Sequence, residues 1–176
     1  MSYQLTTLAV VLTLPGALCI WANRYTGAFA VNCGANDGIF YLKSEYGEYH
    51  DDRRWDIRCR PTPISGPQSC EWTGFVNTWT EPKFMFRCPS GGFIASIYGL
   101  YSSSKYDRQW KIGCCIKTGA RLGECYRTLK INGRGGVMEY ELSAGKVITG
   151  FGGTFDNIFK RDREYKLEVC DMVLDE

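Results

Sequence analysis

The sequence contains few of the groups on which enzymes and metal sites depend. Its 176 residues include a single histidine, His50, which excludes every site built on two histidines, such as an HExxH zinc helix. The nine cysteines include no C-x-x-C pair, no serine stands in a Gly-x-Ser-x-Gly elbow, and no acidic loop has the spacing of a calcium site. Nothing in the spacing of the carboxylates selects a pair for glycoside hydrolysis. We therefore predict a non-enzymatic protein with no cofactor and no metal ion.

Two further absences concern glycosylation and charge. No Asn-x-Ser/Thr sequon occurs, so N-linked glycans are not expected. The formal net charge is only +2, which excludes a bulk polybasic nucleic-acid binder. Hydrophobic residues make up 44% of the chain and charged residues 23%, which is enough apolar sequence for a folded domain and too much for a disordered chain.

The N-terminal segment has the pattern of an export signal. Residues 5–18 carry no charge, and a run of about 14 apolar residues is short for a membrane-spanning helix, which needs roughly 20. Small residues precede plausible cleavage points after residues 19 and 22. We expect a signal peptide over 1–19, or to residue 22, and a secreted domain over 24–176 without a membrane span. Cleavage removes Cys19 and leaves eight cysteines for an oxidising compartment, where disulfides persist.

The mature sequence repeats itself three times with a period of about 55 residues, over approximately 28–79, 80–134 and 135–176. In each copy an Asp-Arg-x-(Trp/Tyr) motif heads a segment that alternates with period two, which predicts a β-strand. Breaks rich in Gly or Pro, at 61–66 and 133–136, predict turns, and no long helical period is visible. We predict an all-β fold whose three repeats form a closed, quasi-threefold architecture, either a β-trefoil or a β-prism. The motif residues are Asp52, Arg53 and Trp55; Asp107, Arg108 and Trp110; and Asp162, Arg163 and Tyr165.

The period also organises the cysteines. One pair of cysteine positions occurs in the first two copies and is replaced by Leu142 and Val169 in the third, as expected for residues that face each other in a core. The other four cysteines form two links of equal 45-residue separation if they pair in keeping with the repeat. An alternative set, Cys70–Cys170 with Cys115–Cys125, breaks this symmetry. The repeat favours the disulfides Cys33–Cys59, Cys88–Cys114, Cys70–Cys115 and Cys125–Cys170.

These features together resemble the dermatopontin family. The resemblance rests on the three motifs, on the adjacent Cys114 and Cys115, and on the closing segment from Arg163 to Cys170, and it covers nearly the whole mature chain. It implies a secreted extracellular-matrix or cell-adhesion protein, similar to invertebrate hemagglutinins and amebocyte aggregation factors. The implied partners are dermatan-sulfate proteoglycans, collagen and cell-surface receptors. Self-association is a separate expectation. Tyr165 departs from the family pattern, in which tryptophan is usual at this position.

The Asp-Arg-x-(Trp/Tyr) motifs have two interpretations. In the structural one, the aspartates begin strands, the arginines bond to backbone or carboxylate groups, and the aromatic side chains fill the core. In the functional one, the motifs form three equivalent sugar sites, whose linkage in one molecule would give avidity. The sequence alone does not choose between them.

A basic segment is the second candidate for binding. Between Lys105 and Arg134 the formal charge is +6, whereas residues 135–176 carry −4. We predict that the segment binds a sulfated polysaccharide or another polyanion, since the planar fork of arginine suits sulfate; the alternative is a solvated face. Tyr46 and Tyr49 lie among acidic residues and are candidates for tyrosine sulfation, the alternative being an ordinary acidic loop. The predicted polyanion-binding residues are Lys105, Lys111, Lys117, Arg121, Arg127, Lys130 and Arg134.

The combined prediction is a secreted, non-catalytic protein that binds sulfated glycans or proteoglycans and bridges cells or matrix fibres. The alternative is a soluble lectin or agglutinin that aggregates cells in a body fluid. Salt dependence separates the two, because binding to sulfated glycans weakens with ionic strength, whereas recognition of neutral sugars does not.

Overall fold

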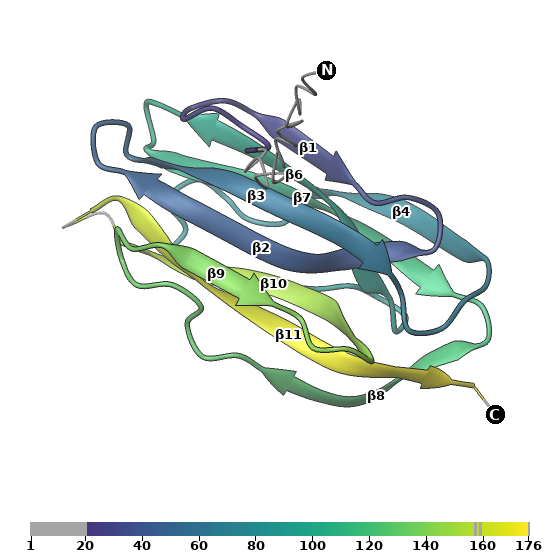
Figure 1. Cartoon of the computed structure of the whole chain (residues 1–176). Helices are drawn as coiled ribbons and strands as arrows, with labels where there is room; N and C mark the ends of the chain where they lie inside the picture. The colour runs from purple at the N-terminus through teal and green to yellow at the C-terminus, as the bar shows by residue number, and fades with distance from the viewer. Residues whose placement is uncertain (1–20, 157, 159, 176) are drawn as a thin grey trace, which may run out of the picture.

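The computed structural model describes residues 21–156, 158 and 160–175, and the signal peptide predicted for 1–19 lies outside them. In this part of the chain all strand pairs are antiparallel and there is no helix (Figure 1). Accordingly, the described residues contain no helix that could cross a membrane. Their eleven strands are β1 (Phe29–Asn32), β2 (Asp37–Gly47), β3 (Asp52–Pro61), β4 (Gln68–Phe75), β5 (Lys83–Arg87), β6 (Phe93–Ser102), β7 (Asp107–Lys117), β8 (Ala120–Arg127), β9 (Met138–Glu141), β10 (Lys146–Asp156) and β11 (Asp162–Leu174).

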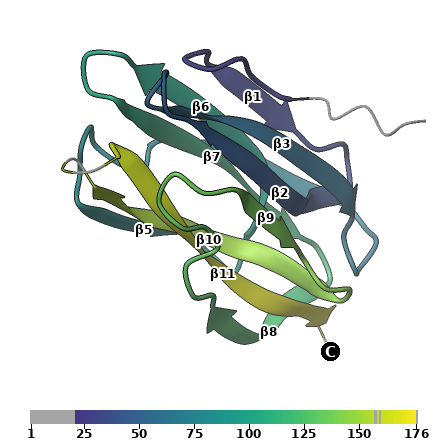
Figure 2. The same cartoon turned by 60° about the vertical axis from the view of Figure 1, so that its left-hand side comes forward.

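The strands form three sheets, and each sheet combines strands from two repeats (Figures 1 and 2). Sheet A has the order β1-β6-β7-β4, sheet B the order β3-β2-β9, and sheet C the order β5-β10-β11-β8. The first strand of each repeat pairs with another repeat: β1 with β6, β5 with β10, and β9 with β2. Each repeat therefore places its first strand in a sheet with another repeat, in a cyclic order that links all three repeats.

The strand pattern follows the alternation in the sequence. In β7 the side chains of Trp110 and Ile112 have no exposed surface, whereas Lys111 between them is partly exposed. Such alternation indicates a sheet with one face on the core and one in solvent. Glycines with positive φ, Gly66 at 136° and Gly135 at 64°, occupy the predicted breaks. The strands expected around residues 55–59, 93–101, 110–114 and 165–169 fall within β3, β6, β7 and β11.

The three motif aromatics meet in the core. Trp55, Trp110 and Tyr165 are buried, and their ring centroids lie 5.0, 5.2 and 6.0 Å apart in edge-to-face orientation. Phe151 lies 5.1 Å from Trp110 and 5.2 Å from Tyr165. Aromatic pairs of this kind add about 0.5–1.5 kcal/mol each beyond the area they bury. Because one ring comes from each repeat, the core depends on all three repeats.

Sheet B has one strand fewer than the other sheets among the described residues. β4 covers the outer edge of β7 and β8 covers that of β11, but no described strand lies along the outer edge of β3. Ile57 lies on this edge. Its counterparts in the other repeats, Ile112 and Leu167, donate their backbone N–H groups to threonine side chains. Ala22 and Asn23 bond to the backbone of Trp55 on this edge, and no described strand runs beside Ile57.

The prediction of an all-β, disulfide-stapled fold is confirmed. The finer prediction of a closed β-trefoil or β-prism remains a prediction. The strands are divided among three separate sheets, and none of the registered strand pairs joins one sheet to the next.

Candidate functional site

The motif charges form a buried ring of three ion pairs. Each motif arginine contacts the motif aspartate of another repeat through Nε and Nη2, and all six side chains are at most 5% exposed. The cyclic order joins every repeat to the other two. The pairs are Arg53 with Asp162, Arg108 with Asp52 and Arg163 with Asp107, with Nη2–Oδ2 distances of 2.6, 2.6 and 2.7 Å.

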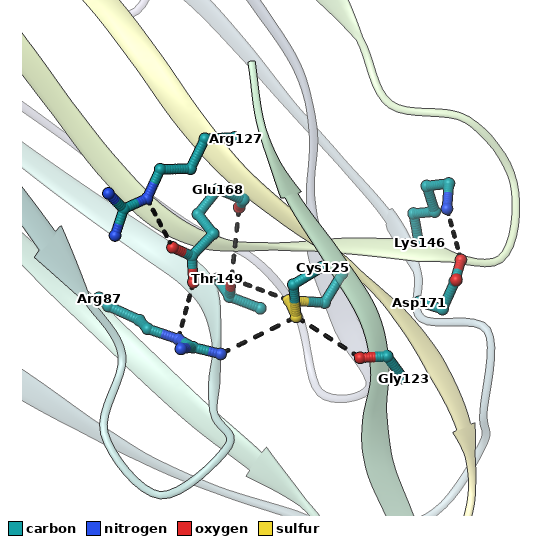
Figure 3. The surroundings of a disulfide bond; sticks show 9 residues. Arg87, Gly123, Cys125, Arg127, Lys146, Thr149, Glu168 and Asp171 are labelled. Carbon is teal, nitrogen blue, oxygen red and sulfur yellow. Dashed lines mark hydrogen bonds and ion pairs between the residues drawn. A yellow bond between two sulfur atoms is a disulfide. The ribbon is translucent and has the colours of Figure 1, made fainter.

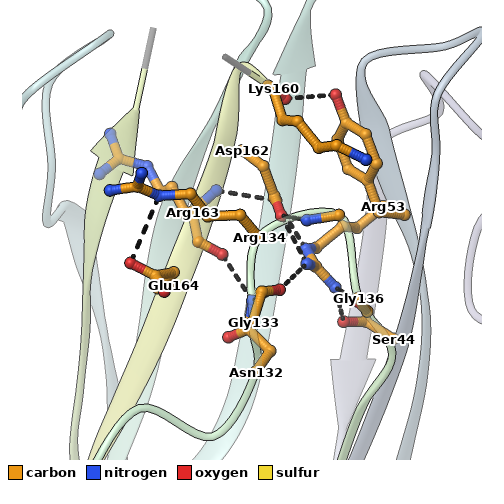
Figure 4. Close-up of polar contacts among 12 residues, drawn as sticks. Ser44, Arg53, Asn132, Gly133, Arg134, Gly136, Lys160, Asp162, Arg163 and Glu164 are labelled. Carbon is orange, nitrogen blue, oxygen red and sulfur yellow. Dashed lines mark hydrogen bonds and ion pairs between the residues drawn. The ribbon is translucent and has the colours of Figure 1, made fainter. Parts of the chain in front are cut away.

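The remaining hydrogen-bonding groups of the ring are also satisfied by the protein. In Figure 4, Arg53 donates to Asp162, to Ser44 Oγ and to the carbonyl oxygens of Gly133 and Gly136. The backbone N–H of Gly135 donates to Asp162 Oδ2 at 2.8 Å. Buried charges are stable only with such partners. The guanidinium therefore has little capacity left for a ligand.

Burial also changes the pKa of a carboxyl group in the ring. It raises the pKa of the Asp52 carboxyl, and the Arg108 guanidinium opposes this effect. The backbone N–H of Thr26, 2.7 Å from Asp52 Oδ2, supports the ionised form as well.

An asparagine in each repeat supports the ring, and the motif pattern did not predict it. Each asparagine accepts a hydrogen bond from the backbone N–H of the motif aromatic and donates one to the carbonyl of the motif arginine. The signal was present, because the three residues recur at offsets of 54 and 55. They are Asn23, Asn77 and Asn132.

The geometry favours the structural interpretation of the motifs. The hollow above the ring has a volume of only about 20 Å³, whereas pockets for small molecules generally measure roughly 300–1,000 Å³. The aromatic rings point into the core, and the charged side chains of the motifs form ion pairs with one another. The motifs therefore hold the repeats together.

The structure contains the four disulfides that the repeat favoured. Cys70 pairs with Cys115 and Cys125 with Cys170, so the alternative set that joined Cys70 to Cys170 is wrong. Each of these two links joins an outer strand to its neighbour, β4 to β7 and β8 to β11. Sheets A and C thus have a covalently fixed outer strand, and Arg87 and Glu168 lie beside the second link (Figure 3).

The seven predicted polyanion-binding residues do not share one environment. Lys117 is buried and donates to Asn36 Oδ1 and to the Gly66 carbonyl oxygen, and burial lowers its pKa. Lys105 and Arg121 are exposed, on a loop and on β8, and Lys111 lies over two aromatic rings. The other three pair with carboxylates of the third repeat: Arg127 with Glu168, Lys130 with Glu164, and Arg134 with Asp156 and Glu164.

A cationic hollow lies on the outer face of sheet C. Its volume is about 200 Å³, and we call it the sheet C hollow. A Cβ at Gly152 would lie 2.5 Å from Met85 Sδ, so the glycine lets Met85 lie across β10. The lining residues are Lys83, Phe84, Met85, Arg127, Thr128, Gly153, Thr154 and Lys166, of which only Arg127 belongs to the predicted basic segment.

The charges of the sheet C hollow are only partly neutralised. Glu168 is shared between Arg87 Nε at 2.7 Å and Arg127 Nε at 3.0 Å (Figure 3). Arg127 nevertheless keeps 67% of its side chain exposed. Lys83 and Lys166 have no ion pair within the described residues. The hollow therefore has positive charge available at its rim.

The two candidate sulfation sites differ in accessibility. Tyr49 is fully exposed, whereas the hydroxyl of Tyr46 donates to Asp51 Oδ1 and to the Lys160 carbonyl oxygen. Burial and the hydrogen bond to the Asp51 carboxylate raise the pKa of Tyr46. Of the two hydroxyls, only that of Tyr49 is open to a modifying enzyme in the folded chain. As for metals, the described residues hold no cluster of three or more His, Cys, Asp or Glu side chains suited to an ion.

Comparisons with known proteins agree with the resemblance seen in the sequence. A family model described as Dermatopontin matches residues 23–174. The chain is 32% identical over 152 residues to hemagglutinin/amebocyte aggregation factor of Limulus polyphemus, which covers 85% of this chain and 86% of that protein. It is 28% identical over 142 residues to dermatopontin of Biomphalaria glabrata, covering 81% and 93%. Millepora cytotoxin-1 of Millepora dichotoma is 23% identical over 148 residues, covering 84% and 65%.

No solved structure matches the chain significantly. None of the names of the relatives describes an enzyme, and the four disulfides fit an extracellular protein. The family model spans nearly all the described residues. This chain belongs to the dermatopontin family.

Proposed function

We propose that the protein is secreted after cleavage of its signal peptide, and that it is a non-catalytic adhesion protein of the extracellular matrix. It binds sulfated glycans or proteoglycans and bridges cells or matrix fibres. The family match and the disulfides support an adhesive role outside the cell. The sheet C hollow is the observation that carries the sulfated ligand.

The chemistry of the sheet C hollow suits a sulfate group. Arg127 is hydrogen-bonded through Nε to Glu168, and with 67% of its side chain exposed its guanidinium is accessible to a ligand. Lys83 on β5 and Lys166 on β11 add two ammonium groups from other strands. Sulfate oxygens accept several hydrogen bonds at once, and charge-assisted bonds are roughly twice as strong as neutral ones. The paired strands fix the backbone positions of the three cations, so that binding has to order only their side chains.

Retention on immobilised heparin tests the proposal. The mature, oxidised protein should elute well above the physiological ionic strength of about 0.15 M, and the variant Lys83→Ala/Lys166→Ala should elute much earlier. The matched control is Lys105→Ala/Arg121→Ala, which removes the same charge from exposed sites outside the hollow and should elute close to the native protein. Flow-through of the native protein near physiological salt contradicts the proposal. Equal losses in both variants would assign retention to net charge alone.

A soluble agglutinin is the second candidate, favoured by the 32% identity to hemagglutinin/amebocyte aggregation factor. Aggregation of cells needs at least two binding sites in each particle. The same protein should then aggregate red cells, and a simple neutral sugar should inhibit the aggregation at high salt. Inhibition by heparin alone would return the preference to sulfated glycans.

A further inference from the structure

A second hollow lies on sheet A, at the position that the repeat relates to the sheet C hollow. Its volume is about 260 Å³, and we call it the sheet A hollow. Trp72, Thr73 and Lys111 on its lining correspond, 55 residues later, to Arg127, Thr128 and Lys166. Both hollows lie beside a disulfide-fixed outer strand. The two hollows occupy equivalent backbone positions, but the side chains that line them differ in chemistry.

The sheet A hollow is lined by aromatic rings. Trp72 of the lining is 48% exposed, and Phe75 on the same strand is 43% exposed. Exposed apolar side chains that lie together mark interaction sites more often than scattered ones do. Ala30, Tyr98, Lys111 and Phe75 follow one another across four paired strands and form a row on the outer face. The small side chain of Ala30 leaves room beside Tyr98.

One cation stands among these rings. Lys111 Nζ lies 4.8 Å from the centroid of the Phe75 ring and 5.9 Å from that of Tyr98. No carboxylate of the described residues pairs with it. Thr73, below the aromatic side chains, is fixed because its Oγ1 accepts the N–H of Ile112 at 2.9 Å. The surface therefore combines rigid apolar rings with an unpaired hydrogen-bond donor.

We propose that the sheet A hollow binds the C–H face of a hexopyranose ring in a neutral glycan. The apolar face of the sugar would stack on Trp72 and Tyr98, and Lys111 would donate hydrogen bonds to its hydroxyl groups. Pockets that combine apolar walls with few convergent polar groups are typical ligand sites. A purely apolar partner fits less well, because it would bury the Lys111 ammonium without an acceptor.

This inference goes beyond the proposed function, since it adds a site for a different ligand. A single molecule would carry one site for a sulfated glycan and one for a neutral glycan, on two different sheets. Such a molecule can bridge two surfaces without forming an oligomer, and its avidity rises when both surfaces display many copies.

Binding to galactose, glucose and mannose coupled to agarose tests the inference. The experiment uses about 0.5 M salt, where the Debye length is only roughly 4 Å and the sheet C hollow contributes little. The oxidised protein should be retained on at least one of the three resins and eluted by the free sugar. Trp72→Ala and Tyr98→Ala should each weaken binding at least tenfold, whereas Tyr126→Ala, a matched exposed aromatic on β8, should not.

Tryptophan fluorescence gives a second readout. Titration with the retained sugar should shift the emission of the native protein, and Trp72→Phe should remove the shift while the protein still binds. The variant Lys83→Ala/Lys166→Ala should keep sugar binding but lose heparin retention, so that failures of the two proposals are distinguishable. Absence of retention on all three resins overturns the inference. Dimerisation that Trp72→Ala abolishes, without sugar binding, would also overturn it and assign the face to a second copy of the chain.

Discussion

The cationic side chains of this protein differ in how deeply they and their ion-pair partners are buried. Arg163 is 2% exposed and places Nη2 2.7 Å from Asp107, whereas Lys160 pairs with Glu48 in solvent. Removing one partner of a buried pair leaves an uncompensated charge in a medium of low dielectric constant. Removing one partner of an exposed pair leaves a hydrated charge. The two kinds of pair therefore contribute very differently to stability.

Asp107→Asn tests the role of the ion-pair ring. The substitution keeps the shape of the side chain but leaves the Arg163 guanidinium buried with no carboxylate, so the free energy of unfolding should fall by about 3–5 kcal/mol. Equilibrium unfolding in urea measures it. The control is Glu48→Gln, which breaks the exposed pair with Lys160 and should change stability little. Equal effects of the two substitutions would contradict the structural role of the ring.

Lys117 illustrates what a sequence cannot show about one residue. It belongs to a segment of charge +6, yet it lies buried with its ammonium bonded to Asn36 and to a backbone carbonyl. The charge count was right, but the count contains no information on which face of a strand each cation occupies. Trp55 is the opposite case, because its ring is buried in the core, as the structural interpretation of the motif expected.

At the scale of elements, the three repeats have equivalent strand pairing, but they differ in whether an outer strand lies beside the motif strand. β7 and β11 each have an outer strand, held by a disulfide, while β3 has none among the described residues. The strands at the motifs, β3, β7 and β11, were predicted from their alternation. Their partners were not, since pairing across repeats depends on contacts between residues far apart in sequence.

The part of the β3 edge at Ile57, beside which no described strand runs, should be visible in amide hydrogen exchange. Ile57 has no acceptor for its N–H among the described residues, whereas Ile112 donates to Thr73 and Leu167 to Thr128. We expect the Ile57 amide to exchange at least about tenfold faster than its two counterparts, as is typical of groups open to solvent. Exchange measured by NMR on the mature protein checks this. Equal protection at the three positions would show that something covers this edge in solution.

A disulfide can be restored to test the equivalence of the repeats. Leu142 and Val169 are buried in one cluster at the positions of Cys88 and Cys114. The variant Leu142→Cys/Val169→Cys should therefore form a fifth disulfide during oxidative folding, with no free thiol left. Peptide mapping by mass spectrometry identifies the link, and Leu142→Cys alone, with one free thiol, is the control. Two free thiols in the double variant would refute the equivalence at this position.

At the scale of the molecule, buried tyrosines should limit stability at high pH. Burial raises the pKa of Tyr41 and of Tyr101 to about 12. Since tyrosine in the unfolded chain ionises near 10.0, the unfolded state loses these protons first. The stability from these groups is thus complete below about pH 10 and is lost as the pH rises toward about 12.

The measurement follows tyrosinate absorbance together with circular dichroism during an alkaline titration. A late fraction of the tyrosinate signal should appear in step with loss of the β-sheet spectrum. Tyr41→Phe should reduce that fraction and make the unfolding transition less steep, because one group that is protonated in the folded state has been removed. Complete ionisation near pH 10 with the fold intact would contradict this prediction.

The molecule as a whole also explains why the sheet C hollow was only partly foreseen. Arg127 was identified from the basic segment between Lys105 and Arg134. Lys83 and Lys166 lie outside this segment, so the segment did not point to them. The order β5-β10-β11-β8 brings the three together. Family, disulfides and the strands at the motifs could be predicted from repeated patterns, whereas a site assembled from three strands required their arrangement in space.

Binding of a sulfated glycan in the sheet C hollow can be observed directly by NMR. Backbone amide shifts are mapped while the mature, oxidised protein is titrated with a short heparin oligosaccharide. We expect shifts concentrated around Lys83, Arg127 and Lys166, which disappear in Lys83→Ala/Lys166→Ala. Shifts around Lys105 and Arg121 instead, or none at all, would contradict it.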